Sequence, residues 1–319
     1  MNRRWLLQRF GSVLIVVLIV CLATYALLDA LPGSTAITVV GTDATPEQIA
    51  IVEQDLGLDQ PFPQRFGVWL GRAARGDLGV SYQTGEIVSV SLRERVPTSL
   101  ELLALTQITA ISIALVTALT SARRENGRLD RALSTGSFFA LALPQFAFGI
   151  ILLIVFAQKL KWFPVADYRQ FSDSPIGNLR ALTLPVLTLA IPLSGIYYRV
   201  LRSDLVQTLR SDHITFARAM GLSPRRILLG RALRPSSLTI ISVIGQNTGY
   251  LLGSSVIAEG LFSVPGLGQF LTRAIQTRDV VKVQGAVLTI ALVYVLVNLA
   301  ADVALAFLDP RVRLERSAA

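Results

Sequence analysis

The stretch GAVLTIALVYVLVNLAADVALAF, residues 285–307, contains a single charged side chain, Asp302. A helix that crosses a hydrocarbon core about 30 Å thick needs about 20 mainly apolar residues. This stretch is long enough, and the chain contains five more of similar length and character. We therefore predict an all-α membrane protein with six transmembrane helices, at Phe10–Leu31, Ser99–Ala122, Ser134–Ala157, Thr183–Leu201, Leu238–Ala258 and Gly285–Phe307.

The composition supports a membrane protein. Of the 319 residues, 52% are hydrophobic and only 16% are charged, whereas soluble domains carry about 25% charged residues. The net charge of +9 lies in the connections between apolar runs, which argues against a nucleic-acid-binding surface. The only cysteine, Cys21, lies inside the first run. It therefore supports neither an internal disulfide nor a thiolate metal site.

Two of the six apolar runs, the first and the fourth, have features that argue against a membrane span. The first follows Arg3, Arg4 and Arg9 as the core of a signal peptide would, but it exceeds the usual core length and lacks a clear cleavage site. We expect it to remain as a span. The fourth is the weakest, because Pro185 and Pro192 interrupt it. Prolines are tolerated where neighbouring helices satisfy the freed carbonyls.

Basic residues set the orientation, because cytoplasmic connections are enriched in Lys and Arg. The N-terminus, the connections 123–131 and 199–235, and the tail hold 18 of the 30 basic residues in about 66 positions. We therefore expect both termini in the cytoplasm. The predicted organisation is a cytoplasmic N-terminus and first span (1–31), an extracytoplasmic loop domain (32–97), a five-span core (98–308) with a cytoplasmic loop at 202–235, and a cytoplasmic tail (309–319).

Local signals predict helices in two connections. Thr45, Pro46 and Gln48 form a capping box that starts a surface helix at about Pro46–Leu56, which Gly57 ends. In the cytoplasmic loop, Asp212 caps a helix over His213–Met220 and Gly221 ends it in a left-handed conformation. Ser223 and Pro224 then start a second helix. We call this helix–glycine–helix segment, residues 212–226, the elbow, and we expect it to act as a rigid lever.

The elbow contains the sequence FARAMGLSPRR, residues 216–226, which resembles the EAA loop of binding-protein-dependent ABC importer permeases. The resemblance is closest to the first of the two permeases of dipeptide and oligopeptide importers. It extends over most of the chain, through the stretches LGLDQP (56–61), GDLG (76–79), ALPQF (142–146), FSVPGLG (262–268), RD (278–279), VQG (283–285) and LDPRVRL (308–314).

The resemblance implies the fold of a type I ABC importer permease in a bacterial inner membrane. It implies that the elbow is the coupling helix that docks on an ATPase, with Ala217, Ala219 and Gly221 at the small positions of the loop. The acidic position of that loop is not acidic here, since Thr215 and Phe216 precede Ala217. The docking residues it implies are His213, Phe216, Ala217, Arg218, Ala219, Met220, Gly221 and Leu222.

The implied partners are a second homologous permease chain, two ATPase subunits, an extracytoplasmic substrate-binding protein and the lipid bilayer. The implied substrate is a dipeptide or oligopeptide, while nickel or another small solute stays open because related permeases carry those. The chain itself needs no cofactor, because ATP and magnesium would bind the ATPase subunits.

Other classes of protein fit the sequence less well. A phosphate-binding loop requires Gly-Lys-Ser/Thr, and no lysine here follows a glycine. An intramembrane serine protease would need a histidine at membrane depth, but the lone His213 lies in the basic loop. A channel or secondary transporter remains an alternative, although we find no convincing internal repeat and no ionisable group in the middle of a span.

Polar residues in the last two spans are the remaining candidates. The fifth contains Gly245, Gly249 and Gly253 at the spacing of close helix packing, together with polar side chains. Helix packing and a polar pathway both explain these residues, for which we name Gln246, Asn247, Gly249, Gly253 and Ser254. Asn298 and Asp302 lie on one helix face, either as a pair satisfied within the bundle or as part of a gate.

Overall fold

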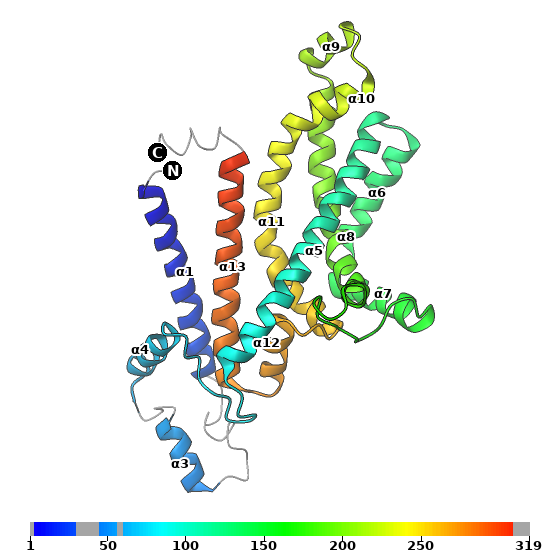
Figure 1. The fold of residues 1–319 in the computed structure, drawn as a ribbon. Coiled ribbons are helices and arrows are strands. Elements are labelled where there is room, and N and C mark those ends of the chain that lie inside the picture. The colour runs from blue at the N-terminus through cyan, green and yellow to red at the C-terminus, as the bar shows by residue number, and fades with distance from the viewer. Residues whose placement is uncertain (1–2, 30–44, 56–59, 309–319) are drawn as a thin grey trace. The chain divides into compact units, whose positions relative to one another are not determined.

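The computed structural model describes residues 3–29, 45–55 and 60–308, and it is helical almost throughout. In that part of the chain the only β-pairing is an isolated bridge between Val80 and Ile87. The helices, labelled in Figure 1, are α1 (Arg3–Asp29), α3 (Pro46–Asp55), α4 (Phe62–Ala73), α5 (Val88–Arg123), α6 (Arg128–Ala142), α7 (Gln145–Leu152), α8 (Pro175–Leu209), α9 (Asp212–Ala219), α10 (Pro224–Arg226), α11 (Leu233–Leu261), α12 (Leu267–Gln276) and α13 (Val280–Leu308), with π-helical turns η1 (Leu153–Lys159) and η2 (Ile227–Ala232).

Three of these helices, α5, α8 and α13, are long and apolar enough to cross a membrane. Two bent pairs, α6 with α7–η1 and residues 224–237 with 239–261, raise the number of candidate spans to five. Within α1, the apolar stretch Ile15–Leu28 is shorter than the length required here of a candidate span. The protein is therefore an all-α membrane protein with three to five candidate spans among its described residues.

The predicted third span, Ser134–Ala157, is wrong as a single helix. The chain leaves helical geometry at Leu143 (φ −76°, ψ 126°) and resumes it after Pro144, and the two helical parts meet at 104°. The pyrrolidine ring of a proline clashes with the preceding residue when that residue is α-helical. Leu143 therefore becomes extended, and the helix changes direction there.

The predicted fourth span behaves in the opposite way. It lies within α8, one continuous helix of 35 residues that contains both Pro185 and Pro192. More than half of its most apolar stretch is buried, and it packs against α6, α7 and α11. Neighbouring helices thus surround α8, which is the condition under which a helix tolerates internal proline.

The chain divides into two compact units. One comprises residues 1–99 and 265–296, and the other comprises 100–264 and 297–319. The sequence analysis divided the chain differently, into cytoplasmic, membrane and extracytoplasmic parts. That division stays a prediction. The predicted helix at Pro46 is confirmed as α3. At its start the Thr45 N–H donates to Gln48 Oε1 (3.0 Å), and the Gln48 N–H donates to Thr45 Oγ1 (3.4 Å). The proposed stop, Gly57, lies outside the described residues.

In the first unit, the loop 77–87 is attached to the segment that joins α12 and α13. Ser81 donates a hydrogen bond to the buried Asp279 (2.5 Å), and Gln83 donates to the Thr277 carbonyl (2.8 Å). Lys282 forms an ion pair with Glu86 (2.9 Å). These contacts hold the start of α5 close to the start of α13.

Close packing at Gly285 gives the first prediction. A Cβ added there would lie 2.6 Å from Val88 Cγ1, and Val88 is fully buried. We expect Gly285→Ala to destabilise the protein by about 1–3 kcal/mol, because overpacking forces neighbours out of position. The matched control is Gly136→Ala on α6, where a Cβ would meet nothing within 4 Å. Thermal unfolding in detergent should show a lower Tm for the first variant only, and equal Tm values would refute the packing argument.

Candidate functional site

The elbow connects α8 to α11 and projects beyond the ends of those helices (Figure 1). Its turn is a Schellman motif. The Gly221 N–H donates to the Arg218 carbonyl (2.9 Å), and the Leu222 N–H donates to the Ala217 carbonyl (3.2 Å). These bonds require a left-handed residue at the position after the C-cap, and Gly221 has φ +79°. The predicted glycine turn is therefore confirmed in its backbone geometry.

The predicted N-cap is wrong by one residue. Ser211, with φ −76° and ψ 156°, is the N-cap of α9, and Asp212 is the first helical residue. The Ser211 hydroxyl donates to the Thr208 carbonyl (2.5 Å) and lies 2.9 Å from His213 Nδ1. Asp212 still favours the helix, because a carboxylate in the first turn complements the positive end of the helix dipole.

The elbow has a small apolar core of its own. Ile214, Ala217 and Ile227 are buried together, with Leu209 and Leu222 packed against them. Ala217 therefore contributes to the inside of the elbow rather than to its surface. This packing joins α9 to η2, the π-helical turn that follows α10, and gives the elbow a fixed shape.

The opposite face of α9 is exposed and also apolar. The Phe216 side chain is 67% exposed and that of Met220 is 68% exposed, and residues four apart lie on one face of a helix. His213, Arg218, Ala219 and Gly221 are exposed as well. Of the eight predicted docking residues, six are thus accessible, while Ala217 and Leu222 support the elbow from within.

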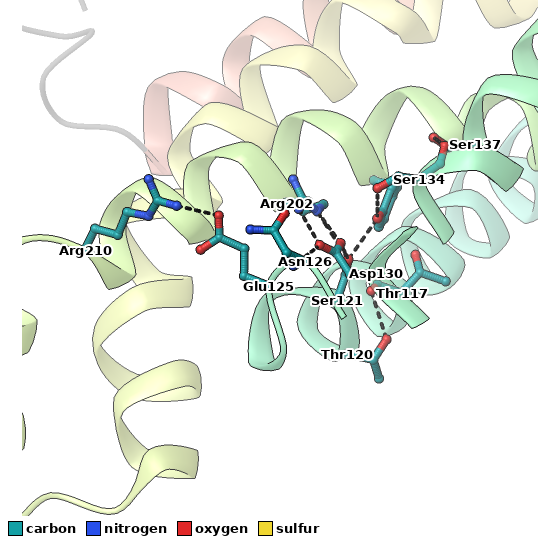
Figure 2. Close-up of polar contacts among 11 residues, drawn as sticks. Thr117, Thr120, Ser121, Glu125, Asn126, Asp130, Ser134, Ser137, Arg202 and Arg210 are labelled. Carbon is teal, nitrogen blue, oxygen red and sulfur yellow. Dashed lines mark hydrogen bonds and ion pairs between the residues drawn. The ribbon is translucent and has the colours of Figure 1, made fainter. Parts of the chain in front are cut away.

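An ion pair between a buried carboxylate and a partly buried guanidinium lies at the base of the elbow (Figure 2). Arg202, near the end of α8, donates from Nε and Nη2 to the two carboxylate oxygens of Asp130 on α6, at 2.6 Å each. Asp130 also accepts hydrogen bonds from the Ser121 hydroxyl of α5 and from the Asn126 N–H (2.8 Å). Only 2% of Asp130 is exposed. We call Asp130, Arg202 and Ser121 the clamp.

Further contacts extend the clamp. The Tyr198 hydroxyl of α8 lies 2.9 Å from the Ser121 hydroxyl and 3.0 Å from that of Ser134 on α6. The clamp joins α5, α6 and α8 at one point.

Comparison with known protein families identifies the class of protein. Residues 110–314 match the model of the binding-protein-dependent transport system inner membrane component, and residues 2–103 match the N-terminal model of the same kind of component. The chain belongs to this family. It is therefore an inner-membrane permease subunit of a binding-protein-dependent ABC importer, a transport subunit rather than an ATPase, and it works with ATPase and binding-protein partners.

Individual relatives cover almost the whole permease. A putative peptide transport system permease protein of Brucella abortus is 34% identical over 97% of this chain and 99% of its own. A probable peptide ABC transporter permease protein of Sinorhizobium fredii is 33% identical over 97% and 99%. The dipeptide transport system permease protein of Alkalihalophilus pseudofirmus is 29% identical over 92% and 94%.

A solved structure supports the fold. A chain of the inward-facing MetNI methionine ABC transporter superposes with a TM-score of 0.53 at 15% identity, covering 68% of the permease and 96% of that chain. Membership in the importer family excludes the ATP-independent channel and the protease considered above. Permeases of this family carry no bound cofactor, and no group of metal-ligating side chains occurs among the described residues.

The predicted pathway residues on α11 do not share one environment. Gln246 and Gly253 are exposed, Asn247 is half-buried, and Gly249 and Ser254 are buried. The Asn247 amide donates to the Val243 carbonyl (2.9 Å) and the Ser254 hydroxyl to the Leu251 carbonyl (3.0 Å). These two polar groups are therefore satisfied by their own helix.

The predicted polar pair lies on α13. Asn298 is half-buried, and the Asp302 side chain lies outside the described part of the protein.

The sequence analysis did not predict the clamp. Its only signals are an aspartate within the basic connection 123–131 and an arginine directly after the fourth apolar run, and neither signal indicates burial or pairing.

The glycine turn of the elbow gives the second prediction. Gly221→Ala keeps open space around the new methyl group but places an L-residue at positive φ, at a cost of about 1–2 kcal/mol. We expect faster hydrogen exchange in residues 212–222 by mass spectrometry. Gly221→Asn is the matched control, because asparagine tolerates this conformation. Equal exchange in alanine and asparagine variants would show that the turn does not set the shape of the elbow.

Proposed function

We propose that the permease imports dipeptides or oligopeptides. It forms the translocation path with a second homologous permease chain, is driven by two ATPase subunits and receives substrate from an extracytoplasmic binding protein. The relatives described above support this proposal, because three permeases that match over more than nine-tenths of this chain carry peptide or dipeptide names.

The exposed face of α9 is the observation that carries the coupling role. Phe216 and Met220 present apolar surface on a segment whose other face already packs into the elbow core. Exposed apolar surface of this kind marks an interaction site. The elbow follows α8 and leads into α11, so an ATPase subunit that binds Phe216 and Met220 would act directly on both helices.

We further propose six spans with both termini in the cytoplasm. In this arrangement α1 is the first span, and the bent pair of α6 and α7–η1 is the third. The concentration of basic residues in the N-terminus, the tail and the connections 123–131 and 199–235 supports the orientation. The elbow then lies on the side where ATP is available.

The exposed stripe of α11 is the proposed lining of the path. Five residues are exposed at successive intervals of three or four and thus follow one helix face: Gln246, Tyr250, Gly253, Ile257 and Gly260. Lipid disfavours an exposed amide such as that of Gln246 in the middle of a span. We therefore place this face toward the substrate and the second permease chain.

Removing the apolar docking surface gives the third prediction. Phe216→Asp and Met220→Asp should each reduce co-purification of ATPase chains with the tagged permease by at least about tenfold, which is a loss of about 1.4 kcal/mol of binding free energy. Both side chains are exposed, so the fold should survive. The matched control is Phe171→Asp, because Phe171 is an exposed aromatic residue outside the elbow (53% exposed).

Retention of ATPase chains by both elbow variants would overturn the docking surface. Loss of ATPase chains in the Phe171→Asp variant as well would show that the effect comes from general damage to the permease.

The path gives the fourth prediction, with dialanine as the probe. We expect cells that carry the complete importer to take up labelled dialanine, and we expect Gln246→Trp to reduce uptake at least tenfold by filling the path while ATPase chains still co-purify. The control is Ile108→Trp, an exposed position on α5 (62% exposed). Dialanine uptake equal to that of cells lacking the permease would contradict the peptide proposal, and full uptake by Gln246→Trp would contradict the placement of the path.

A further inference from the structure

The clamp joins the helix that leads into the elbow to two other helices. Arg202 lies seven residues before the end of α8, and α9 begins three residues after that end. The partners of Arg202 belong to α5 and α6, and Asn126 lies in the short turn between those helices. Any movement of the elbow that tilts or shifts α8 therefore acts on α5 and α6 through the clamp.

Both oxygens of the Asp130 carboxylate are fully paired, which makes the clamp stiff. One Asp130 oxygen accepts from Arg202 Nε and Ser121, and the other accepts from Arg202 Nη2 and Asn126. Two parallel bonds from a guanidinium to a carboxylate fix the relative orientation as well as the distance. Hydrogen bonds that fully pair a buried group such as this carboxylate also resist rearrangement. The bonds thus allow little independent rotation of α8 against α6.

A second ion pair attaches the same turn closer to the elbow. Arg210, the residue after α8, contacts Glu125 of the α5–α6 turn at 2.6 Å. Arg202 and Arg210 are eight residues apart, which corresponds to about 12 Å along a helix. Figure 2 shows both contacts on the same side of α8. Attachment at two separated points resists rotation better than attachment at one.

A contribution to stability alone does not account for the clamp. Replacing a buried ion pair with apolar side chains of similar volume is often neutral or stabilising. The pair is therefore costly compared with simple packing, whereas it provides the geometric precision that packing lacks. Close packing of the same helices already exists beside it, since a Cβ at Gly195 of α8 would lie 3.2 Å from the Ser137 carbonyl of α6.

We propose that Asp130 and Arg202 are positioning residues for energy coupling, which make α5, α6 and α8 follow the elbow as one body when the ATPase moves it. This inference rests on the proposed docking of the elbow. In the wild-type protein, the distance between the elbow and the first turn of α6 stays the same in the two nucleotide states. Without the ion pair, the elbow and α8 move while α6 lags behind.

The test measures that distance in the complete importer, with its partner chains, in lipid nanodiscs. Spin labels are attached at Leu129→Cys and Arg225→Cys, both exposed, in a Cys21→Ala background. Distances are recorded by electron paramagnetic resonance without nucleotide and with ATP and vanadate. We expect the same narrow distance distribution in both states for the wild-type clamp. Asp130→Asn should give a distribution that differs between the states and is broader in at least one.

Three further variants complete the design. Asp130→Glu keeps the charge and should restore most of the wild-type behaviour. Tyr198→Phe removes one hydroxyl and should broaden the distribution slightly, and it replaces Asp130→Asn if that variant does not fold. Asp77→Asn breaks the exposed pair with Arg72 (2.9 Å) in the other unit and should change nothing.

Each outcome has a separate meaning. If Asp130→Asn lowers the Tm but keeps one distance in both states, the clamp is only structural and the inference is wrong. A wild-type distance that changes with nucleotide also overturns the inference, because the clamp then does not hold the elements together. Absence of ATPase chains from the wild-type preparation would instead refute the docking of the elbow, on which the inference depends.

Discussion

Backbone hydrogen bonding within the membrane is the constraint on which the rest of the structure depends. Apolar surroundings offer no water to pair with N–H and C=O groups, so the spans must be helical. Polar side chains follow the same rule: the Thr188 hydroxyl donates to the Leu184 carbonyl and the Asn247 amide to the Val243 carbonyl of their own helices. Segments that satisfy themselves in this way offer few polar groups to partners, so we expect partners to be recognised mainly by the connections between the spans.

Local chemistry predicted the elbow because its signals are local. A glycine followed by Leu, Ser and Pro specifies a left-handed stop and a new helix within six residues, and Gly221 has that conformation. The position of the cap was less certain, because Ser211 and Asp212 are both good capping residues and only the backbone shows which one precedes the helix. The resemblance also implied Ala217 as a docking residue, whereas the structure buries it together with Ile214 and Ile227.

The proline residues and the clamp show what a single sequence cannot specify. Pro185 and Pro192 lie within a continuous helix, whereas Pro144 separates two helices at 104°. Every proline disfavours a helical residue before it, so the local sequence does not distinguish the three sites; α8 stays continuous where α6, α7 and α11 pack against it. Asp130 and Arg202 are 72 residues apart, and each looks like a solvated charge at the end of an apolar run. Their pairing follows from the packing of α6 on α8, so it appears only in three dimensions.

The elbow has one buried apolar face and one exposed apolar face, and the exposed face is unfavourable when the chain is alone in water. One face of α9 buries Ile214 and Ala217, which gives the segment its shape, while Phe216 and Met220 leave large apolar side chains in water. A surface segment of this length needs only one apolar face to pack against its own protein. The second apolar face adds to stability only when another molecule covers it. The elbow is a stiff segment with a spare apolar face, and Arg202 of the preceding α8 contacts α5 and α6. It is therefore suited to the proposed role of passing force from a partner into the bundle.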